Sequence, residues 1–345
     1  MQDIRSRLRA AAALAAVALA IPSPSAMAQP ADQFFKGKTV NIYIGFAPGG
    51  TYDYYGRVVA RFLGKHILGE PTVIPHTMPG SGSFRAANFL FSAAPKDGTA
   101  MGVVTQTLAL EEALKSPGAQ YKAAEFNWIG RMTSIMEVYF TWRTSKAKTI
   151  ADARQHEIPM AGTGSGSPSE GYPKLLNALA GTKFKIISGY PGSTQGMLAM
   201  ERGEVDGGLT SWNTIKRTKQ SWIANRDLNI LVQFANTRHS DLPNVPTALE
   251  PAATEEGKRI LAFYISGAEL GRSLLAPPGI PADRVKVLRA AFDAMLKDRE
   301  FLAEIERTGQ EFQPAPGEAV QKLIQEAASA PRSVVERAEA ILRAK

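Results

Sequence analysis

The chain has 345 residues, of which 44% are hydrophobic, and this length predicts about two compact lobes rather than one small module. It has no cysteine, which excludes disulfides, thiolate zinc sites, iron–sulfur clusters and cysteine nucleophiles. The formal net charge of +8 favours anionic partners, which include nucleic acids and small organic acids.

The first 28 residues have the order of a secretory signal. Three arginines within the first nine residues precede a small apolar run, Ala10 to Ile21, and a small-residue stretch ends at Ala28. A membrane anchor is the alternative, but this run is about a dozen residues long and a bilayer needs roughly 20. We therefore expect cleavage after Ala28 and a mature chain that is periplasmic in a Gram-negative bacterium and not embedded in the membrane.

The rest of the chain alternates predicted strands and helices. A β-rich segment, Thr39 to Gly45, comes first, and a helical pattern begins at Thr51. Further strands are expected at 71–74, 99–104, 156–160, 184–187, 205–210 and 228–234, and further helices at 83–93, 108–114, 170–180, 195–202, 285–295 and 320–324. Such repeated units predict an α/β fold on open sheets, with ligands bound beyond the carboxyl ends of the strands.

Three glycine-rich loops follow predicted strands and are the main candidates for a binding site. They cover residues 48–51, 79–83 and 162–167. Glycine lets the backbone approach a ligand closely, and the helix that follows a loop presents free N–H groups that suit an anion. Thr51 is a candidate N-cap, whereas Asp53 is explained by the helix dipole and by a pair with Arg57. Each loop alone fits a plain turn or connector equally well, but three at strand ends favour binding.

No catalytic, metal or nucleotide motif accompanies these loops. No two of the four histidines stand at i,i+4, no serine lies in a G-x-S-x-G motif, and the third loop lacks the spacing of a dinucleotide or P-loop fingerprint. Lysine and arginine are scattered, and their densest cluster, 216–219, is short. We therefore expect a binding protein with no cofactor, no metal and no nucleic-acid partner. A secreted α/β hydrolase is the less favoured alternative, because it needs an activated nucleophile and the sequence shows no motif that provides one.

The segment Ile44 to Arg57, with its phenylalanine, proline, glycine pair, aspartate and arginine, resembles the opening signature of the Bug proteins. These are the TctC-type solute receptors of tripartite tricarboxylate transporters. Further matches to that family follow in order at 78–82, 95–99, 162–167, 189–192, 202–206, 242–247 and 276–281. Each motif is weak, but the ordered set is specific and covers essentially the whole mature chain.

The resemblance implies a two-lobed periplasmic binding protein of type II, a Venus flytrap in which each lobe is a mixed sheet flanked by helices. Lobe 1 would comprise residues 29–137 and 236–345, and lobe 2 residues 138–235. The implied function is to bind a small organic carboxylate between the lobes and to deliver it to a transporter with two membrane subunits. An orphan carboxylate sensor without its own transporter is the alternative, and we expect a monomer.

The resemblance also implies that backbone amides and hydroxyls of the two loop regions hold the carboxylate, rather than an arginine clamp. The expected ligand-binding residues are Phe46, Pro48, Gly49, Gly50, Thr51, Asp53 and Gly82 in lobe 1, and Thr163, Gly164, Ser165, Gly166, Ser167, Tyr190 and Asp206 in lobe 2. Four aromatic residues add apolar surface near the predicted mouth: Tyr52, Tyr54, Tyr55 and Trp212. Ordinary packing explains them as well, but in the cleft they would favour an aromatic or longer apolar acid over citrate.

Overall fold

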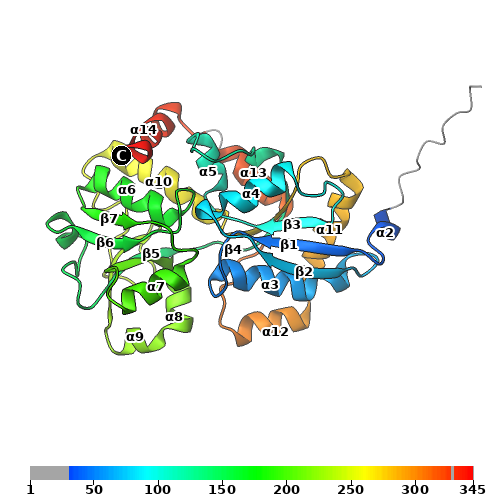
Figure 1. The fold of residues 1–345 in the computed structure, drawn as a ribbon, viewed down its shortest axis with the longest axis horizontal. Coiled ribbons are helices and arrows are strands. Elements are labelled where there is room, and N and C mark those ends of the chain that lie inside the picture. The colour runs from blue at the N-terminus through cyan, green and yellow to red at the C-terminus, as the bar shows by residue number, and fades with distance from the viewer. Residues whose placement is uncertain (1–30, 328–329, 345) are drawn as a thin grey trace, which may run out of the picture.

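The computed structural model describes residues 31–327 and 330–344, so the expected signal segment lies outside the described residues. The described chain folds into two mixed α/β halves, which lie next to each other along the long axis of the molecule (Figure 1). This arrangement confirms the fold class expected from the alternation of strands and helices. None of the helices in these two ranges combines the length and apolarity that crossing a bilayer requires.

The first half contains a six-stranded sheet in the order β11-β4-β10-β3-β1-β2. β1 runs parallel to β2 and β3, whereas β10 runs antiparallel to β3 and β4. The strands are β1 (Thr39–Ile44), β2 (Thr72–Thr77), β3 (Ala100–Val103), β4 (Asn127–Thr133), β10 (Arg272–Ala276) and β11 (Ala315–Pro316). The helices of this half are α2 (Ala31–Phe34), α3 (Thr51–Leu63), α4 (Phe84–Ser92), α5 (Leu108–Ala113), α11 (Ala282–Met295), α12 (Arg299–Arg307) and α13 (Gly317–Ala327).

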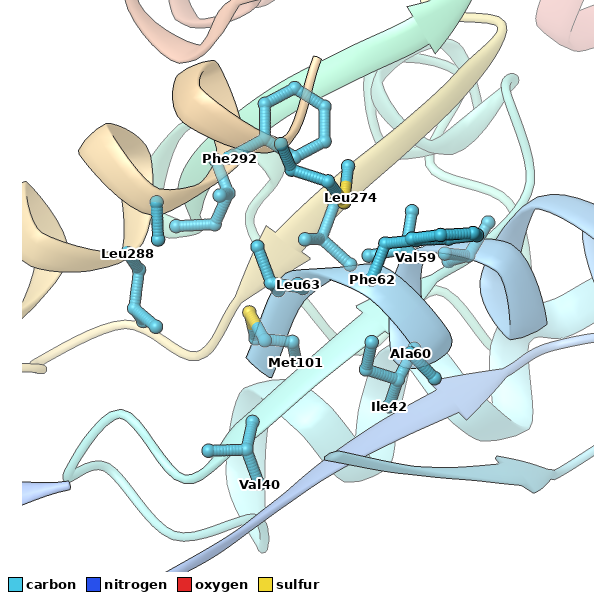
Figure 2. Packing of buried hydrophobic residues seen from close by; sticks show 14 of the residues in the cluster. Val40, Ile42, Val59, Ala60, Phe62, Leu63, Met101, Leu274, Leu288 and Phe292 are labelled. Carbon is cyan, nitrogen blue, oxygen red and sulfur yellow. The ribbon is translucent and has the colours of Figure 1, made fainter. Parts of the chain in front are cut away.

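One of the core clusters of the first half lies where β1, α3 and α11 meet (Figure 2). Alternate residues of β1 are buried, and Val40 and Ile42 contribute to this cluster. Val59 and Leu63, which stand four residues apart on α3, pack into it together with Phe292 of α11. Each side chain of this size contributes about 1.5–3 kcal/mol when it is fully buried. The core therefore fixes α3 against the sheet and, with it, the loop that joins β1 to α3.

The second half contains a five-stranded sheet in the order β7-β6-β8-β5-β9. β6 is parallel to β7 and β8, and β5 is antiparallel to β8 and β9. Its strands are β5 (Glu137–Trp142), β6 (Ile158–Ala161), β7 (Phe184–Ile187), β8 (Gly207–Ser211) and β9 (Leu228–Phe234). Its helices are α6 (Pro168–Ala180), α7 (Ser193–Glu201), α8 (Trp212–Thr218), α9 (Gln220–Ala224), α10 (Glu255–Ile265) and α14 (Arg332–Arg343).

The chain passes from the first sheet to the second between β4 and β5, and it returns between α10 and β10. α10 and α14 lie beside α6, at the upper left of Figure 1. Ile260 and Tyr264 of α10 and Ala338 of α14 share one core cluster with Tyr172 of α6. Two helices within the range 236–345 thus pack with the second half, because their apolar faces have their partners there. The lobe limits expected from the sequence stay a prediction.

Most of the expected elements are present, and two of them agree with the sequence to the residue. These are β7, at 184–187, and β9, at 228–234. The sequence pattern did not indicate β4, β5 and β10, which are the strands next to the two crossings between the sheets. β5 begins with Glu137 and β10 begins with Arg272. Both charged residues are buried in the folded protein, which their local sequence does not predict.

Candidate functional site

A cavity of about 50 Å³ lies where the carboxyl ends of β1, β6 and β8 face one another across the two halves. Phe46, Ala47, Gly50, Thr51 and Tyr52 line it from the loop after β1 and the start of α3. The second half contributes mainly hydroxyl groups, from Thr163, Ser167, Ser169, Ser193, Thr210 and Ser211. Common small-molecule pockets measure about 300–1,000 Å³. The cavity is small by comparison and suits a compact ligand.

Direct contacts between loops of the two halves close the cavity. The Ala47 N–H donates to the carbonyl of Pro191, and the Gly82 N–H donates to the carbonyl of Thr163, both at 3.1 Å. Gly82 has a φ of +62°, and a Cβ at this position would lie 2.5 Å from the backbone nitrogen of Ser167. Only glycine fits such a position without strain. Gly82 thus acts in the contact between the halves and does not line the cavity.

Four helices begin at the cavity: α3, α6, α7 and α8. The Ser211 side chain caps α8 by accepting from the Thr214 N–H at 3.1 Å, whereas α3, α6 and α7, with 13, 13 and 9 residues, have no side-chain cap. The N-cap of α3 is Gly50, not Thr51 as expected, and no side chain caps this helix. Gly192 is the N-cap of α7 and likewise provides no side chain, while Ser167 is the N-cap of α6. The first N–H groups of a helix carry a partial positive charge, and three such ends around one cavity favour an anion.

The hydroxyl groups at the start of α6 form one cluster. Thr163 Oγ1, Ser167 Oγ and Ser169 Oγ lie 2.7–3.0 Å from one another. Ser167 Oγ also lies 2.8 Å from the carbonyl oxygen of Gly164 and donates to it in that geometry. A hydroxyl can rotate to donate or to accept. This wall of the cavity can therefore bind a hydrogen-bond donor or a hydrogen-bond acceptor of a ligand.

The cavity also holds a buried charged network that was not expected from the sequence. Arg272 Nε donates to Thr51 Oγ1 at 2.9 Å, and Arg272 Nη1 donates to Gln106 Oε1 at 2.7 Å. The amide of Gln106 donates in turn from Nε2 to Glu137 Oε2 at 3.0 Å. The guanidinium carbon of Arg272 lies 3.7 Å from the centre of the Tyr52 ring, which stacks on Phe46 with 4.4 Å between ring centres. Arg272 is 2% exposed and Glu137 6% exposed, so both charges are almost fully desolvated.

Burial dominates the protonation chemistry of this network. Desolvation raises the pKa of Glu137 to about 7, although Arg272 and the Gln106 hydrogen bond oppose the shift. Desolvation also raises the pKa of the Tyr52 phenol, with Arg272 lowering it. The neutral Tyr52 hydroxyl accepts a hydrogen bond from the Gln106 backbone N–H at 3.0 Å. The Thr105 side chain forms a further hydrogen bond with this hydroxyl.

The structure brings only some of the expected site residues to the cavity. Five of them line it: Phe46, Gly50, Thr51, Thr163 and Ser167. The other nine do not line it, and these are Pro48, Gly49, Asp53, Gly82, Gly164, Ser165, Gly166, Tyr190 and Asp206. Two of the nine hold the loop at 162–167 in place by hydrogen bonds. The Gly164 N–H donates to Glu170 Oε1 at 2.9 Å, and the Gly166 carbonyl accepts from Thr107 Oγ1 at 3.0 Å.

Asp53 and Asp206 have structural partners. Asp53 Oδ2 accepts from the Gly49 N–H at 3.1 Å, and Asp53 Oδ1 pairs with Arg57 Nε at 2.7 Å. The dipole-and-pair explanation of Asp53 therefore agrees with the geometry. Asp206 precedes β8, at the amino end of that strand, and its Oδ2 accepts from Ser145 Oγ at 2.7 Å. The site, by contrast, lies at the carboxyl end of β8.

Of the four aromatic residues expected near the mouth, Tyr52 alone lines the cavity. Tyr54 Oη lies 2.5 Å from Thr308 Oγ1, and the Tyr55 hydroxyl donates to the carbonyl of Glu311. Trp212 Nε1 donates to Asp241 Oδ2 at 3.0 Å. These three therefore serve packing, as in the ordinary explanation.

Among the described residues, no group of three or more His, Asp or Glu side chains is arranged to hold a metal ion. Sequence reasoning missed Gln106, Glu137 and Arg272, which come from three separate segments. The signal that could have found two of them is a lone charge at the head of an apolar strand, as in Glu137-Val-Tyr-Phe and Arg272-Ser-Leu-Leu. Unpaired charges are seldom buried, so such a charge indicates a partner brought by the fold.

Comparison with known proteins finds one matching family model and several solved structures with a similar fold. A family model described as the tripartite tricarboxylate transporter family receptor matches residues 56–339. The solved structure of the periplasmic binding protein BugD is similar, with a TM-score of 0.70 and 20% sequence identity, over 87% of this chain and 97% of that one. MatC from Rhodopseudomonas palustris, solved with bound malate, gives a TM-score of 0.68 at 23% identity, over 87% of this chain and 99% of that one.

A second R. palustris protein, solved with adipate, gives a TM-score of 0.67 at 18% identity, over 87% of this chain and 97% of that one. No curated protein sequence matches the chain. At these identities the solved structures show a shared fold, the two-lobed architecture of periplasmic binding proteins.

Proposed function

The chain belongs to the family of tripartite tricarboxylate transporter receptors, and from this membership we propose that it binds a small organic carboxylate in the cavity between its two halves. As a member of this family it is a periplasmic solute-binding receptor and not an enzyme. The observation that carries the proposal is the meeting of three uncapped helix N-termini with a buried arginine at one cavity.

The chemistry of the cavity supports an anionic ligand. The N-terminus of one helix stabilises an anion by about 0.3–1 kcal/mol at an exposed site, and by more where water is excluded. Arg272 adds a full positive charge that is 2% exposed, and hydroxyls of the second half add donors. The two similar R. palustris structures were solved with malate and with adipate, which are both small carboxylates. Gly50, Thr51, Thr163 and Ser167 are the expected site residues that would contact the ligand first.

Binding between two halves implies a closing motion. A ligand that contacts both halves stabilises the closed form by the difference of its affinities for the closed and open forms. We place the hinge at the two crossings, near residues 134–136 and 266–271, which join the sheets. The contacts of Ala47 with Pro191 and of Gly82 with Thr163 would form on closure.

The description of the family supports our further proposal that the receptor delivers its ligand to a transporter with two membrane subunits. We propose in addition that residues 1–28 are a cleavable signal peptide and that the mature receptor is a monomer. An orphan carboxylate sensor is the alternative, and co-purification of the receptor with its membrane subunits, or its failure, separates the two roles.

The test of the binding function is to identify the ligand directly. Denaturing the purified protein should release a small carboxylate, which mass spectrometry identifies. The refolded protein should be stabilised when that acid is added back. At a ligand concentration of 100 times Kd, the expected stabilisation is about 2.7 kcal/mol. Neutral and cationic analogues of the same size serve as controls. If no carboxylate raises the melting temperature while a neutral analogue does, the proposed function is wrong.

A further inference from the structure

We propose that Asn213 and Arg217 of α8 are positioning residues that raise the affinity of the receptor for its ligand from outside the cavity. They join the second half to residues 309–311 of the first half, through a set of hydrogen bonds that we call the α8 contact. Neither side chain lines the cavity, and neither do residues 309–311. The inference rests on the proposed binding of a carboxylate between the two halves. It concerns how tightly the halves hold together and not which acid they hold.

α8 is fixed in the second half by one face and reaches the first half with another. Trp212 and Ile215 belong to a core cluster of the second half. Asn213 and Arg217 stand four residues apart, so they share a face of the helix. Residues 309–311 connect α12 to β11 and thus belong to the first half. The α8 contact therefore joins two parts of the chain that must move relative to each other when the halves open.

Asn213 binds the backbone of the first half at two points. With its amide in the orientation that gives both atoms a partner, the nitrogen donates to the Gly309 carbonyl at 3.2 Å and the oxygen accepts from the Glu311 N–H at 2.8 Å. The Asn213 residue is 6% exposed. A hydrogen bond weakens steeply when its distance or angle changes. A buried amide that matches one carbonyl and one N–H therefore tolerates little displacement of the two halves.

Arg217 adds a second anchor one helical turn further along α8. Its Nε and Nη2 donate to the side-chain oxygen of Gln310 at 2.8 and 3.2 Å, again in the amide orientation that provides an acceptor. Gln310 is buried. The guanidinium carbon of Arg217 also lies 5.7 Å from the centre of the Tyr54 ring on α3, within the range at which a cation is attracted to an aromatic face. α8 thus contacts both α3 and the segment at 309–311.

The segment that receives α8 is itself held in the first half. The Tyr55 hydroxyl donates to the carbonyl of Glu311, and Tyr54 Oη lies 2.5 Å from Thr308 Oγ1. Gly309 has a φ of +61°, the left-handed conformation in which glycine commonly follows the end of a helix. Both tyrosines come from α3, whose first residues line the cavity. Because α8 also begins at the cavity, the α8 contact sets the spacing of two cavity walls.

Loss of the α8 contact should weaken binding without any change at the ligand. Water replaces these hydrogen bonds in the open form, so each contributes only the modest net value of a neutral hydrogen bond. Two of them shift the equilibrium between open and closed forms by about a factor of ten. The apparent Kd rises by the same factor, because it scales inversely with the fraction of the binding-competent form. The dissociation rate takes this change, since the ligand enters the open form before the contact exists.

The experiment compares two asparagines that make the same kind of hydrogen bond in different places. Asn213→Ala removes the amide of the α8 contact, whereas Asn177→Ala removes an amide that bonds to the N–H and the carbonyl of Phe184 within the second half. Calorimetry and stopped-flow tryptophan fluorescence on the ligand-free mature protein measure the Kd and the rates for the tightest binder among propionate, malate, adipate and citrate. We expect Asn213→Ala to raise the Kd and the dissociation rate about tenfold and to keep the association rate. Asn177→Ala should keep all three at their wild-type values.

The outcomes separate this inference from the proposed function. If Asn213→Ala keeps the wild-type Kd and dissociation rate, or if Asn177→Ala changes them as much, the α8 contact does not set the affinity and the carboxylate receptor stands. If none of these acids binds the wild-type protein, the proposed function fails, and this inference fails with it.

A second variant decides the question if Asn213→Ala does not fold. Arg217→Met keeps an aliphatic stem of similar length but donates nothing to Gln310, and we expect its Kd to be about three times higher, with faster dissociation. A wild-type Kd in Arg217→Met would overturn the inference in that case.

Discussion

Replacing Glu137 with glutamine should change how the stability of the protein depends on pH. Burial raises the pKa of this carboxyl from an ordinary 4.5 to about 7 in the folded protein. Between these two values the folded state holds a proton that the unfolded state has lost. The free energy of unfolding of the wild-type protein therefore falls as pH rises from about 4.5 to 7, and it stays reduced at higher pH.

The size of the effect follows from the two pKa values. One pKa unit corresponds to 1.36 kcal/mol, so a shift from 4.5 to about 7 gives a loss of about 3 kcal/mol between pH 4.5 and pH 8. Glutamine has the shape of the protonated acid and does not titrate. The variant therefore lacks this loss and should gain about 3 kcal/mol relative to the wild type over the same pH range.

Urea unfolding of both proteins at pH 4.5 and pH 8, without ligand, measures this difference. The buried Glu111, whose pKa is also raised by desolvation, titrates equally in both proteins and cancels in the comparison. Glu256→Gln, at an exposed position, should show the wild-type dependence on pH. Parallel stability curves for the wild type and Glu137→Gln would refute the reasoning, because they would mean that Glu137 titrates normally in the folded protein.

Three further substitutions test the site. Arg272→Lys should weaken carboxylate binding at least tenfold in calorimetry, since lysine cannot donate to Thr51 and to Gln106 in the planar geometry of a guanidinium; an unchanged Kd would remove Arg272 from the site. Gly82→Ala should reduce the compaction that ligand produces in solution scattering, because a Cβ would lie 2.5 Å from the Ser167 nitrogen of the opposite half; full compaction would contradict the assigned contact. Asp206→Asn should leave the Kd unchanged while lowering stability by about 1 kcal/mol, because a neutral amide oxygen replaces the charged acceptor of the Ser145 Oγ hydrogen bond. A large loss of affinity in Asp206→Asn would restore Asp206 to the site.

Local sequence patterns were sufficient for the parts of the site that depend on local chemistry. The loop at 48–51 was expected from a β-rich run, a proline and a glycine pair, and its Gly50 and Thr51 do line the cavity. The loop at 162–167 likewise ends at Ser167, where α6 begins. Strand ends and helix starts are set by residues close together in the chain, which explains why they could be predicted.

Where a local pattern was ambiguous, tertiary packing decided. Thr51 fits an N-cap by its type, but Arg272 draws its hydroxyl into the buried network, and Gly50 takes the cap position. Tyr52 and Tyr54 are neighbours on α3, yet Tyr52 lies against the guanidinium and Tyr54 lies against Thr308. The sequence shows three tyrosines within about one helical turn, and only the packing of the helix determines that Tyr52 is the one that lines the cavity.

The sequence by itself determined the α/β class, the family resemblance and the loops that surround the cavity, because each of these depends on periodicity and turn chemistry along short stretches. The tertiary structure alone decided the charges inside the cavity. Arg272 and Gln106 are 166 residues apart, and Gln106 and Glu137 are 31 apart, so no local spacing relates them. They meet because β10 and β5 both start at the crossings between the two sheets, and burial there gives these ordinary residues their unusual chemistry.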